Sequence, residues 1–224
     1  MPSTAVEDYL KCIYKMQLEE EIGRIPTGLI ARAMTVTPGT ATVMMKTLAE
    51  SGLVAYKPYS GVDLTPAGLE IARRVLRRHR VVELFLVKIL GMDWSEVHRD
   101  AEVLEHAVSD RVIERMDEML ESPRFDPHGD PIPSVQGTVV QTKHPSLLTC
   151  PIVQPLLVAR ILDQNADFLR FLEEHRLTPG SALELRERRE EIDAVTVFTE
   201  GEVEVSFGFR VAGAILVEPK TKRE

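Results

Sequence analysis

Cysteine is scarce in this 224-residue chain: only Cys12 and Cys150 occur, far apart in the sequence. They form no Cys-x-x-Cys pair, which excludes a zinc ribbon, and two cysteines cannot supply the disulfide framework of a small secreted domain. The N-terminal residues also lack the basic start and apolar run of a secretory signal peptide. We therefore expect a cytoplasmic protein with reduced thiols.

Long apolar runs and an excess of positive charge are absent too. No stretch approaches the roughly 18 apolar residues of a membrane-spanning helix, so we expect no membrane partner. The net charge of −8 argues against general affinity for nucleic acid. The deficit is uneven, because residues 1–74 carry eight basic and eight acidic side chains whereas residues 75–135 carry eight and thirteen. The N-terminal part is thus better suited to meet a phosphate backbone.

Motifs of catalysis are missing as well. The His-Glu-x-x-His motif of zinc hydrolases is absent, since Glu105-His106 has no second histidine at that spacing. The sequence contains no phosphate-binding Gly-rich loop and no pattern of an apolar nucleotide pocket, so we predict no organic cofactor. The protein is not expected to be an enzyme, although a metal-dependent hydrolase stays open as an alternative.

The chain does contain six carboxylates and imidazoles in two short runs. They are His79, Glu83, His98, Glu102, Glu105 and His106. The first two are one helical turn apart, and the other four occupy positions i, i+4, i+7 and i+8 of one helix face. Such a stripe normally carries Leu and Val toward a core, whereas these side chains are ligands for a divalent cation. We predict a metal site; the alternative is a solvated network of salt bridges.

Residues 1–74 have the element order of a winged helix-turn-helix domain. Helices are predicted at 4–19, 28–34 and 38–51, followed by a two-stranded hairpin within 53–65 and a long helix from Pro66. The third helix would enter the major groove of double-stranded DNA by its N-terminal end. The residues expected to contact DNA are Thr37, Pro38, Gly39, Thr40, Thr42, Val43 and Lys46 of this helix and Lys57 of the hairpin. None of them is Arg or Gln, so we expect apolar or shape-based readout.

The rest of the chain changes from a helical to a β pattern. Residues 75–135 are predicted to form a helical domain, with the ligand stripe on a helix at 94–108 and another helix at 109–121. Residues 136–154 have the composition of a linker. Five short apolar or alternating runs in 155–224, with one helix between the first two, predict a small β-barrel. The predicted fold class is α+β, with three domains.

Several strings along almost the whole chain match a known pattern. They include Glu7-Asp8-Tyr9-Leu10, Leu64-Thr65-Pro66-Ala67-Gly68, Arg78-His79-Arg80, Glu105-His106-Ala107-Val108-Ser109-Asp110 and Gly129-Asp130-Pro131-Ile132-Pro133. In these strings the chain resembles the metal-dependent repressors of the diphtheria-toxin-repressor and manganese-transport-regulator type. The resemblance implies a homodimer with a winged helix-turn-helix domain, a helical dimerisation and metal-binding domain and, as in longer members, an SH3-like barrel. It also implies palindromic operator DNA as the partner.

The resemblance further implies two metal sites. One uses His79, Glu83 and His98, and the other uses Asp8, Glu102, Glu105 and His106. Iron-type members have Met at the position of residue 8 and Cys at that of residue 102. Both residues are carboxylates here, as in manganese-type members, and hard oxygen in place of soft sulfur favours Mn²⁺. Fe²⁺ is the alternative, because the two ions differ little in hardness.

The string Asp126-Pro127-His128-Gly129 resembles one in barrel-containing manganese-type members, whose Cys and His help to hold a metal. Asp126 replaces that Cys and is still a competent ligand; the alternative for His128 is a solvent-exposed loop residue. The candidates for a further ligand from the barrel are Asp163, Gln164 and Asp167. Short manganese-type members have Glu at the position of Lys11, so their two-metal cluster does not carry over unchanged.

These features predict a manganese-responsive transcriptional repressor that controls metal homeostasis. In its metal-free form, we expect repulsion between Asp8 and the carboxylates of Glu102 and Glu105 to keep the first helix loose. A bound cation would fix that helix and set the spacing of the two recognition helices in the dimer. Three alternatives stay open: iron(II) dependence, a metal-dependent hydrolase, and a winged-helix regulator that senses an organic ligand.

Overall fold

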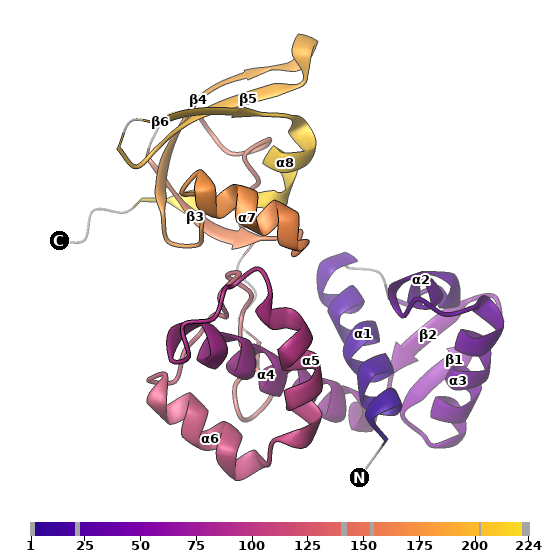
Figure 1. Ribbon diagram of the computed structural model, residues 1–224. Coiled ribbons are helices and arrows are strands. Elements are labelled where there is room, and N and C mark those ends of the chain that lie inside the picture. Colours follow the sequence, from indigo (N-terminus) through magenta and orange to yellow (C-terminus); the bar gives the residue numbers. More distant parts are fainter. Residues whose placement is uncertain (1–2, 21–22, 140–142, 153–154, 202, 221–224) are drawn as a thin grey trace. The chain divides into compact units, whose positions relative to one another are not determined.

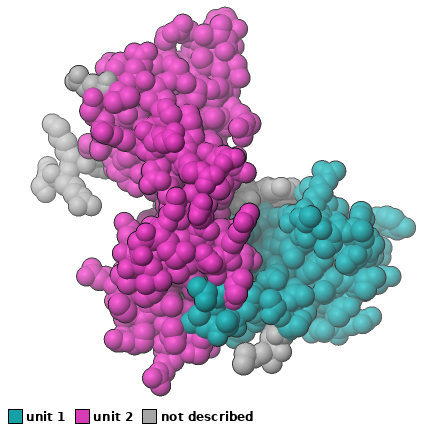
Figure 2. Space-filling model, viewed as in Figure 1, with its two compact units in different colours: residues 1–79, 104–108, 133–139 teal, residues 80–103, 109–132, 140–224 magenta. Residues whose placement is uncertain are grey.

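The computed structural model describes residues 3–20, 23–139, 143–152, 155–201 and 203–220. The chain forms two compact units (Figure 2). The first contains residues 1–79, 104–108 and 133–139, and the second contains residues 80–103, 109–132 and 140–224. The long helix α4, Pro66–Lys88, belongs to both. Within the described ranges, no helix is long and apolar enough to cross a membrane.

The first unit is a winged helix-turn-helix domain, as predicted (Figure 1). Its elements before α4 are α1 (Thr4–Glu20), α2 (Thr27–Ala33), α3 (Pro38–Glu50), β1 (Val54–Lys57) and β2 (Gly61–Leu64). The two strands pair antiparallel and form the wing. The core contains apolar side chains from all three helices, the wing and the start of α4, among them the fully buried Leu10, Ile30 and Leu48.

Two threonines fix the starts of the helices around the wing. The hydroxyl of Thr37 accepts a hydrogen bond of 3.1 Å from the backbone N–H of Thr40, and a proline follows it, so α3 begins where predicted. The hydroxyl of Thr65 accepts a hydrogen bond of 3.1 Å from the N–H of Gly68. A β-carbon on Gly68 would lie 2.0 Å from the carbonyl oxygen of Leu53. Only glycine therefore lets α4 pack this closely against the chain that enters the wing.

The helical part of the second unit consists of the end of α4, the start of α5 (Val97–Ala107) and α6 (Asp110–Met119). The sequence pattern predicts that α5 begins at Trp94, but the helix begins at Val97. The reason is local: the carboxylate of Asp93 accepts a hydrogen bond of 2.8 Å from the backbone N–H of Ser95 and holds this segment in a turn.

The second unit also contains a five-stranded antiparallel sheet in the order β6-β5-β4-β3-β7. The strands are β3 (Leu156–Ile161), β4 (Ala182–Arg189), β5 (Ala194–Thr199), β6 (Val203–Phe207) and β7 (Ile215–Pro219). The helix α7 (Ala166–Glu174) follows β3, as predicted. The pattern does not predict the short helix α8 (Phe209–Ala214), because so few residues show no helical period.

The sequence predicts a linker at residues 136–154, but part of this segment belongs to the sheet domain. Leu147 and Cys150 are buried in the same core as the strands. The backbone N–H of Leu147 donates a hydrogen bond of 3.0 Å to the carbonyl of Ile215. The composition concealed this packing, because the two apolar residues stand in a polar, Pro-rich run. Residues 140–142 and 153–154 of the predicted linker lie outside the described residues.

Candidate metal centres and DNA interface

Asp8, Glu105 and His106 form what we call the first-helix cluster, which lies in the first unit. Their ligand atoms are all within 4.8 Å of one another. Nε2 of His106 lies 2.8 Å from Asp8 Oδ1 and 3.2 Å from Glu105 Oε1. Glu7 contacts the other ring nitrogen, Nδ1, at 2.7 Å. Three of the four residues that the resemblance assigns to this site thus meet in the structure.

The first-helix cluster is rich in opposite charges. Burial alone would lower the pKa of His106, but its hydrogen bonds to Glu7 and Asp8 and the nearby charge of Glu105 outweigh burial and raise it. Lys11 adds a second positive charge, since its Nζ lies 2.6 Å from Oε1 of Glu105. This corrects the expectation of mutual repulsion in the metal-free form. A protonated imidazole and an ammonium group lie among the carboxylates and hold them together.

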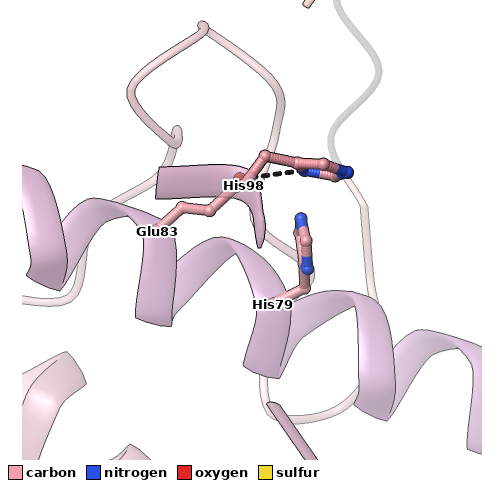
Figure 3. Close-up of side chains that lie close together, drawn as sticks. All are labelled: His79, Glu83 and His98. Atoms are coloured by element: carbon pink, nitrogen blue, oxygen red, sulfur yellow. Dashed lines mark hydrogen bonds and ion pairs between the residues drawn. The ribbon is translucent and has the colours of Figure 1, made fainter. Parts of the chain in front are cut away.

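Of the other predicted ligands on α4 and α5, only Glu102 groups differently from what the resemblance implies. His79, Glu83 and His98 come together as expected, with ligand atoms within 4.8 Å of one another (Figure 3). Nδ1 of His98 lies 3.0 Å from Glu83 Oε1. Glu102 does not join Asp8 in the first-helix cluster. It forms a group with His79 and Glu105, and its side chain is 38% exposed.

Glu83, Asp126 and His128 form a second cluster, the loop cluster, within the second unit, and all three are buried. Oδ1 of Asp126 shapes the loop by accepting hydrogen bonds from the backbone N–H groups of His128 at 2.8 Å and Asp130 at 2.9 Å. Gly129 between them has a φ of +86°, and a β-carbon there would lie 2.1 Å from the carbonyl oxygen of Ala159. Only glycine therefore lets this loop pack against β3.

The imidazole of His128 is held in one orientation by Trp94. Nε2 of His128 donates a hydrogen bond of 3.1 Å to the carbonyl oxygen of Trp94, and the two rings stack with centroids 5.5 Å apart. The donor at Nε2 leaves a lone pair on Nδ1. Burial lowers the pKa of His128, which favours this neutral form. His128 is only 1% exposed, so the alternative of a solvent-exposed loop residue is wrong.

The remaining nitrogen of His128 fits a metal ligand. Nδ1 is buried and has no hydrogen-bond partner among the residues that the structure describes. It lies 4.0 Å from Glu83 Oε2 and 3.9 Å from Asp126 Oδ1. An orphaned imidazole nitrogen between two carboxylates, with its other nitrogen fixed by a carbonyl, is the arrangement that a divalent cation requires of its ligands.

Buried carboxylates lie close to one another in the loop cluster. Burial raises the pKa of Asp126, and the neighbouring Asp130 and Glu83 raise it further. Arg80 opposes this, since it lies 3.5 Å from both Asp126 and Asp130, and Arg160 also pairs with Asp130. Three buried carboxylates thus lie close together, with Arg80, Arg160 and, beside Glu83, His98 as their partners. A cation would relieve the repulsion between these like charges, which is costly in a buried site.

The three candidate ligands from the barrel lie apart from both clusters or touch only their edge. Asp167 pairs at 2.6 Å with an arginine on α7, and its side chain is 89% exposed. Asp163 lies 3.4 Å from an arginine of α8. Gln164 donates a hydrogen bond of 3.1 Å to Asp130, beside the loop cluster. Across the described ranges, neither aspartate belongs to a group that could hold a metal.

The predicted DNA face borders a groove of about 550 Å³ in the first unit. It is lined by residues of α2, α3 and the wing, among them Thr42, Lys46, Tyr56 and Tyr59. Tyr59 is fully exposed at the tip of the wing, where its φ is +62°. A groove with a lysine on one wall and tyrosines on the other suits a sugar–phosphate strand.

The threonines of α3 present methyl groups more than free hydroxyls. The hydroxyls of Thr37 and Thr40 lie 2.9 Å apart, and that of Thr42 donates a hydrogen bond of 2.7 Å to the carbonyl of Pro38. Val43, which is 65% exposed, adds an apolar surface on the same helix. Gly39, Lys46 and Lys57 are exposed as well. This surface is compatible with apolar readout, and the contacts with DNA stay a prediction.

Comparison with known proteins identifies the domains. The model for the N-terminal DNA binding domain of iron dependent repressors matches residues 1–62, and the model for their metal binding and dimerisation domain matches residues 65–134. The chain belongs to the iron-dependent repressor family. A FeoA domain model matches residues 146–219, which include the five-stranded sheet.

The relatives in this repressor family include a transcriptional regulator and a manganese-dependent repressor. The HTH-type transcriptional regulator MntR of Shouchella clausii is 36% identical over 121 residues, which is 54% of this chain and 82% of that protein. A solved manganese-dependent transcriptional repressor in complex with manganese is 38% identical with a TM-score of 0.86, covering 96% of this chain and 99% of that chain. The IdeR structure of T. acidophilum is 27% identical with a TM-score of 0.76, covering 98% of this chain and 100% of that chain.

Some residues around the first-helix cluster and the loop cluster could not be recognised from the sequence. Trp94 acts through its backbone carbonyl, which its residue type does not reveal. Glu7 precedes Asp8 and looks like a capping residue of α1. Arg80 and Asp130 stand in strings typical of the family, but the strings do not tell that the two side chains are buried together.

Proposed function

We propose that this chain is a homodimeric, manganese-responsive transcriptional repressor that controls metal-ion homeostasis by binding palindromic operator DNA. The first-helix cluster carries the proposal. Asp8 belongs to α1 in the DNA-binding domain, whereas Glu105 and His106 belong to α5 in the metal-binding and dimerisation domain. A ligand set shared by two domains couples cation binding to the position of the first helix.

Glu7 orients the imidazole of His106 toward the other two residues of the first-helix cluster. It accepts a hydrogen bond from Nδ1–H of His106, so that the neutral ring turns the lone pair of Nε2 toward Asp8 and Glu105. When bound there, a divalent cation supplies two positive charges, and His106 gives up its extra proton. Asp8 then ties α1 to α5 without that proton. We expect this to fix α1 and to set the distance between the two recognition helices of the dimer.

The ligand types favour manganese. Asp8, Glu102 and Glu105 offer carboxylate oxygen, and no cysteine occurs in any ligand group among the described residues. Oxygen and imidazole ligands suit Mn²⁺, whereas thiolates would select softer metals. The relatives named for manganese agree with this assignment. Fe²⁺ is the second candidate, supported by the IdeR relative and by the similar hardness of the two ions.

The loop cluster is proposed to bind a second cation with a structural task. Asp126 and His128 lie in the loop that packs on β3, whereas Glu83 lies on α4. A cation held by all three would fasten the loop between α4 and the sheet. Because the site offers only carboxylate oxygen and one imidazole nitrogen, we expect it to accept several divalent cations with little discrimination.

Fluorescence anisotropy tests the function. A palindromic duplex is selected from a random pool by the protein in Mn²⁺, labelled, and titrated with protein in Mn²⁺, anaerobic Fe²⁺ or EDTA. We expect the Kd in Mn²⁺ to be about 100-fold lower than in EDTA. A Kd that is lower in Fe²⁺ than in Mn²⁺ would favour the iron alternative. Binding that EDTA leaves unchanged would refute a metal-responsive repressor.

A further inference from the structure

Lys11 is a buried lysine beside the first-helix cluster. It is 6% exposed and lies one turn after Asp8 on α1, next to the core residue Leu10. Its Nζ is 2.6 Å from Oε1 of Glu105, which is 1% exposed. An ammonium group at this depth loses its hydration, so it is stable only with an ionic partner close by. Lys11 is therefore part of the charge balance of the cluster rather than of a solvated face.

The partner of Lys11, Glu105, has two oxygens with separate surroundings. Oε1 faces Lys11 at 2.6 Å and Nε2 of His106 at 3.2 Å, whereas Oε2 lies 2.5 Å from Nδ1 of His79. Glu105 also belongs to two ligand groups, one with Asp8 and His106 and one with His79 and Glu102. A carboxylate shared in this way is suited to bridge two divalent cations, which lie about 3.5–4 Å apart in two-metal sites.

The ammonium group of Lys11 opposes a second cation. Its fixed positive charge at Oε1 of Glu105 repels a further divalent ion and partly neutralises the carboxylate that this ion would share. A carboxylate oxygen has two lone pairs, so the hydrogen bond from Lys11 is compatible with one cation on the same oxygen. We propose that the ammonium group of Lys11 takes the place of a second cation in the first-helix cluster and thereby restricts this cluster to a single divalent cation.

This inference rests on the proposed metal binding at the first-helix cluster and adds its stoichiometry. If the cluster holds one cation, the position of α1 depends on a single binding event, and two cations in the same cluster cannot bind cooperatively. Lys11 also keeps Glu105 in place before a cation arrives.

Equilibrium dialysis followed by elemental analysis counts the Mn²⁺ ions bound per full-length chain. The variants are Asp8→Ala, Lys11→Glu and Lys15→Glu. Lys15 is the matched control, because it is one turn further along α1, half-buried, and undergoes the same change of charge. We expect Asp8→Ala to bind one Mn²⁺ fewer than wild type, Lys11→Glu to bind one more, and Lys15→Glu to equal wild type.

The possible failures are distinguishable. Equal counts in wild type and Asp8→Ala refute metal binding at the first-helix cluster, and the inference with it. A loss of two Mn²⁺ in Asp8→Ala, or no gain in Lys11→Glu, overturns only the inference, as does a gain in Lys15→Glu. Should Lys11→Glu fail to fold, Lys11→Met removes the charge at similar volume. We expect it to bind Mn²⁺ about tenfold more tightly in competition with a fluorescent chelator, and unchanged or weaker binding overturns the inference.

Discussion

The first-helix cluster and the loop cluster use the same types of ligand but hold their histidines differently. In the first-helix cluster, both nitrogens of His106 contact carboxylates and Glu105 is paired with Lys11. In the loop cluster, Nδ1 of His128 has no hydrogen-bond partner in the described part of the chain, although it lies about 4 Å from carboxylates of Glu83 and Asp126. The histidine of the first cluster thus contacts carboxylates through both nitrogens, whereas one nitrogen of His128 is left for another ligand.

This difference suggests two tasks for metal in one chain. A cation held by the first-helix cluster would require the neutral form of His106 and would share Glu105 with an ammonium group, so we expect its binding to be opposed and readily reversed. A cation held by the loop cluster would contact the buried Nδ1 of His128, so we expect it to stabilise the second unit and to be lost slowly. We infer that the first-helix cluster is the switch and the loop cluster is a structural site.

Asp8→Ala is expected to have the largest effect. Asp8 is the proposed ligand on α1, so without it a bound cation no longer connects α1 to α5. DNA binding in saturating Mn²⁺ should therefore weaken about 100-fold, to the level in EDTA. Anisotropy with the selected duplex measures it. Asp167→Ala is the control, because Asp167 is exposed and pairs with an arginine, and it should bind DNA like wild type. Wild-type affinity in Asp8→Ala would show that the switch lies elsewhere.

Gly129→Ala should break the loop cluster without removing any ligand. The added β-carbon would lie 2.1 Å from the carbonyl oxygen of Ala159, and the φ of +86° is strained for alanine. We therefore expect a loss of about 3 kcal/mol in the free energy of unfolding. Urea titration measures it. Gly180→Ala is a matched control, since its φ is +90° but no atom lies within 4 Å of the added carbon. It should lose only about 1 kcal/mol, and equal losses would refute the role of close packing at Gly129.

His128→Ala should remove a stabilisation that depends on metal. At a Mn²⁺ concentration of about 100 times Kd, one lost site lowers the metal-induced gain in stability by about 2.7 kcal/mol. The measurement is the difference between urea titrations in Mn²⁺ and in EDTA, which cancels the packing cost of the substitution itself. DNA affinity in saturating Mn²⁺ should stay within about threefold of wild type. A loss of DNA binding as large as in Asp8→Ala would contradict the separation of tasks.

The smallest expected effect concerns pH and metal-free protein. The pKa of His106 is raised in the folded chain, so its contribution to stability is lost as pH rises through that pKa. The pKa of His128 is lowered, so stability is lost as pH falls below the ordinary pKa of histidine. The measured quantity is the Tm at roughly pH 8 minus the Tm at roughly pH 5.5, both in EDTA. Compared with wild type, we expect His106→Gln to increase this difference and His128→Gln to decrease it, each by about 2 °C. Shifts of the same sign would contradict the two charge states.

Spacing along the sequence predicted most of the side chains that come together in the structure, because the faces of a helix are a local property. It could not tell which ligands share a site. Glu102 and His106 are one turn apart on α5, yet they fall into different groups, since residues of α1 and α4 decide the grouping. Nor could spacing show that Lys11 is buried, because lysines are usually solvated. Asp163 and Asp167 are candidate ligands by residue type alone, and both pair with arginines in the structure.

The fold was predictable for a related reason. Caps, proline and glycine mark the ends of α3 and α4 in the local sequence, so the winged helix-turn-helix order followed from them. The packing of Leu147 and Cys150 in the sheet domain depends on contacts with distant strands, and no local pattern carries that information. The same holds for the pairing of Gly129 with the backbone of β3.

Hydrogen–deuterium exchange of the α1 amides tests the switch most directly. We predict that Mn²⁺ slows exchange in α1 by about tenfold in wild type and in His128→Ala, because Asp8 fastens this helix when the first-helix cluster is loaded, and that Asp8→Ala shows no slowing. Exchange in wild-type α1 that is equal with and without Mn²⁺ would contradict the account.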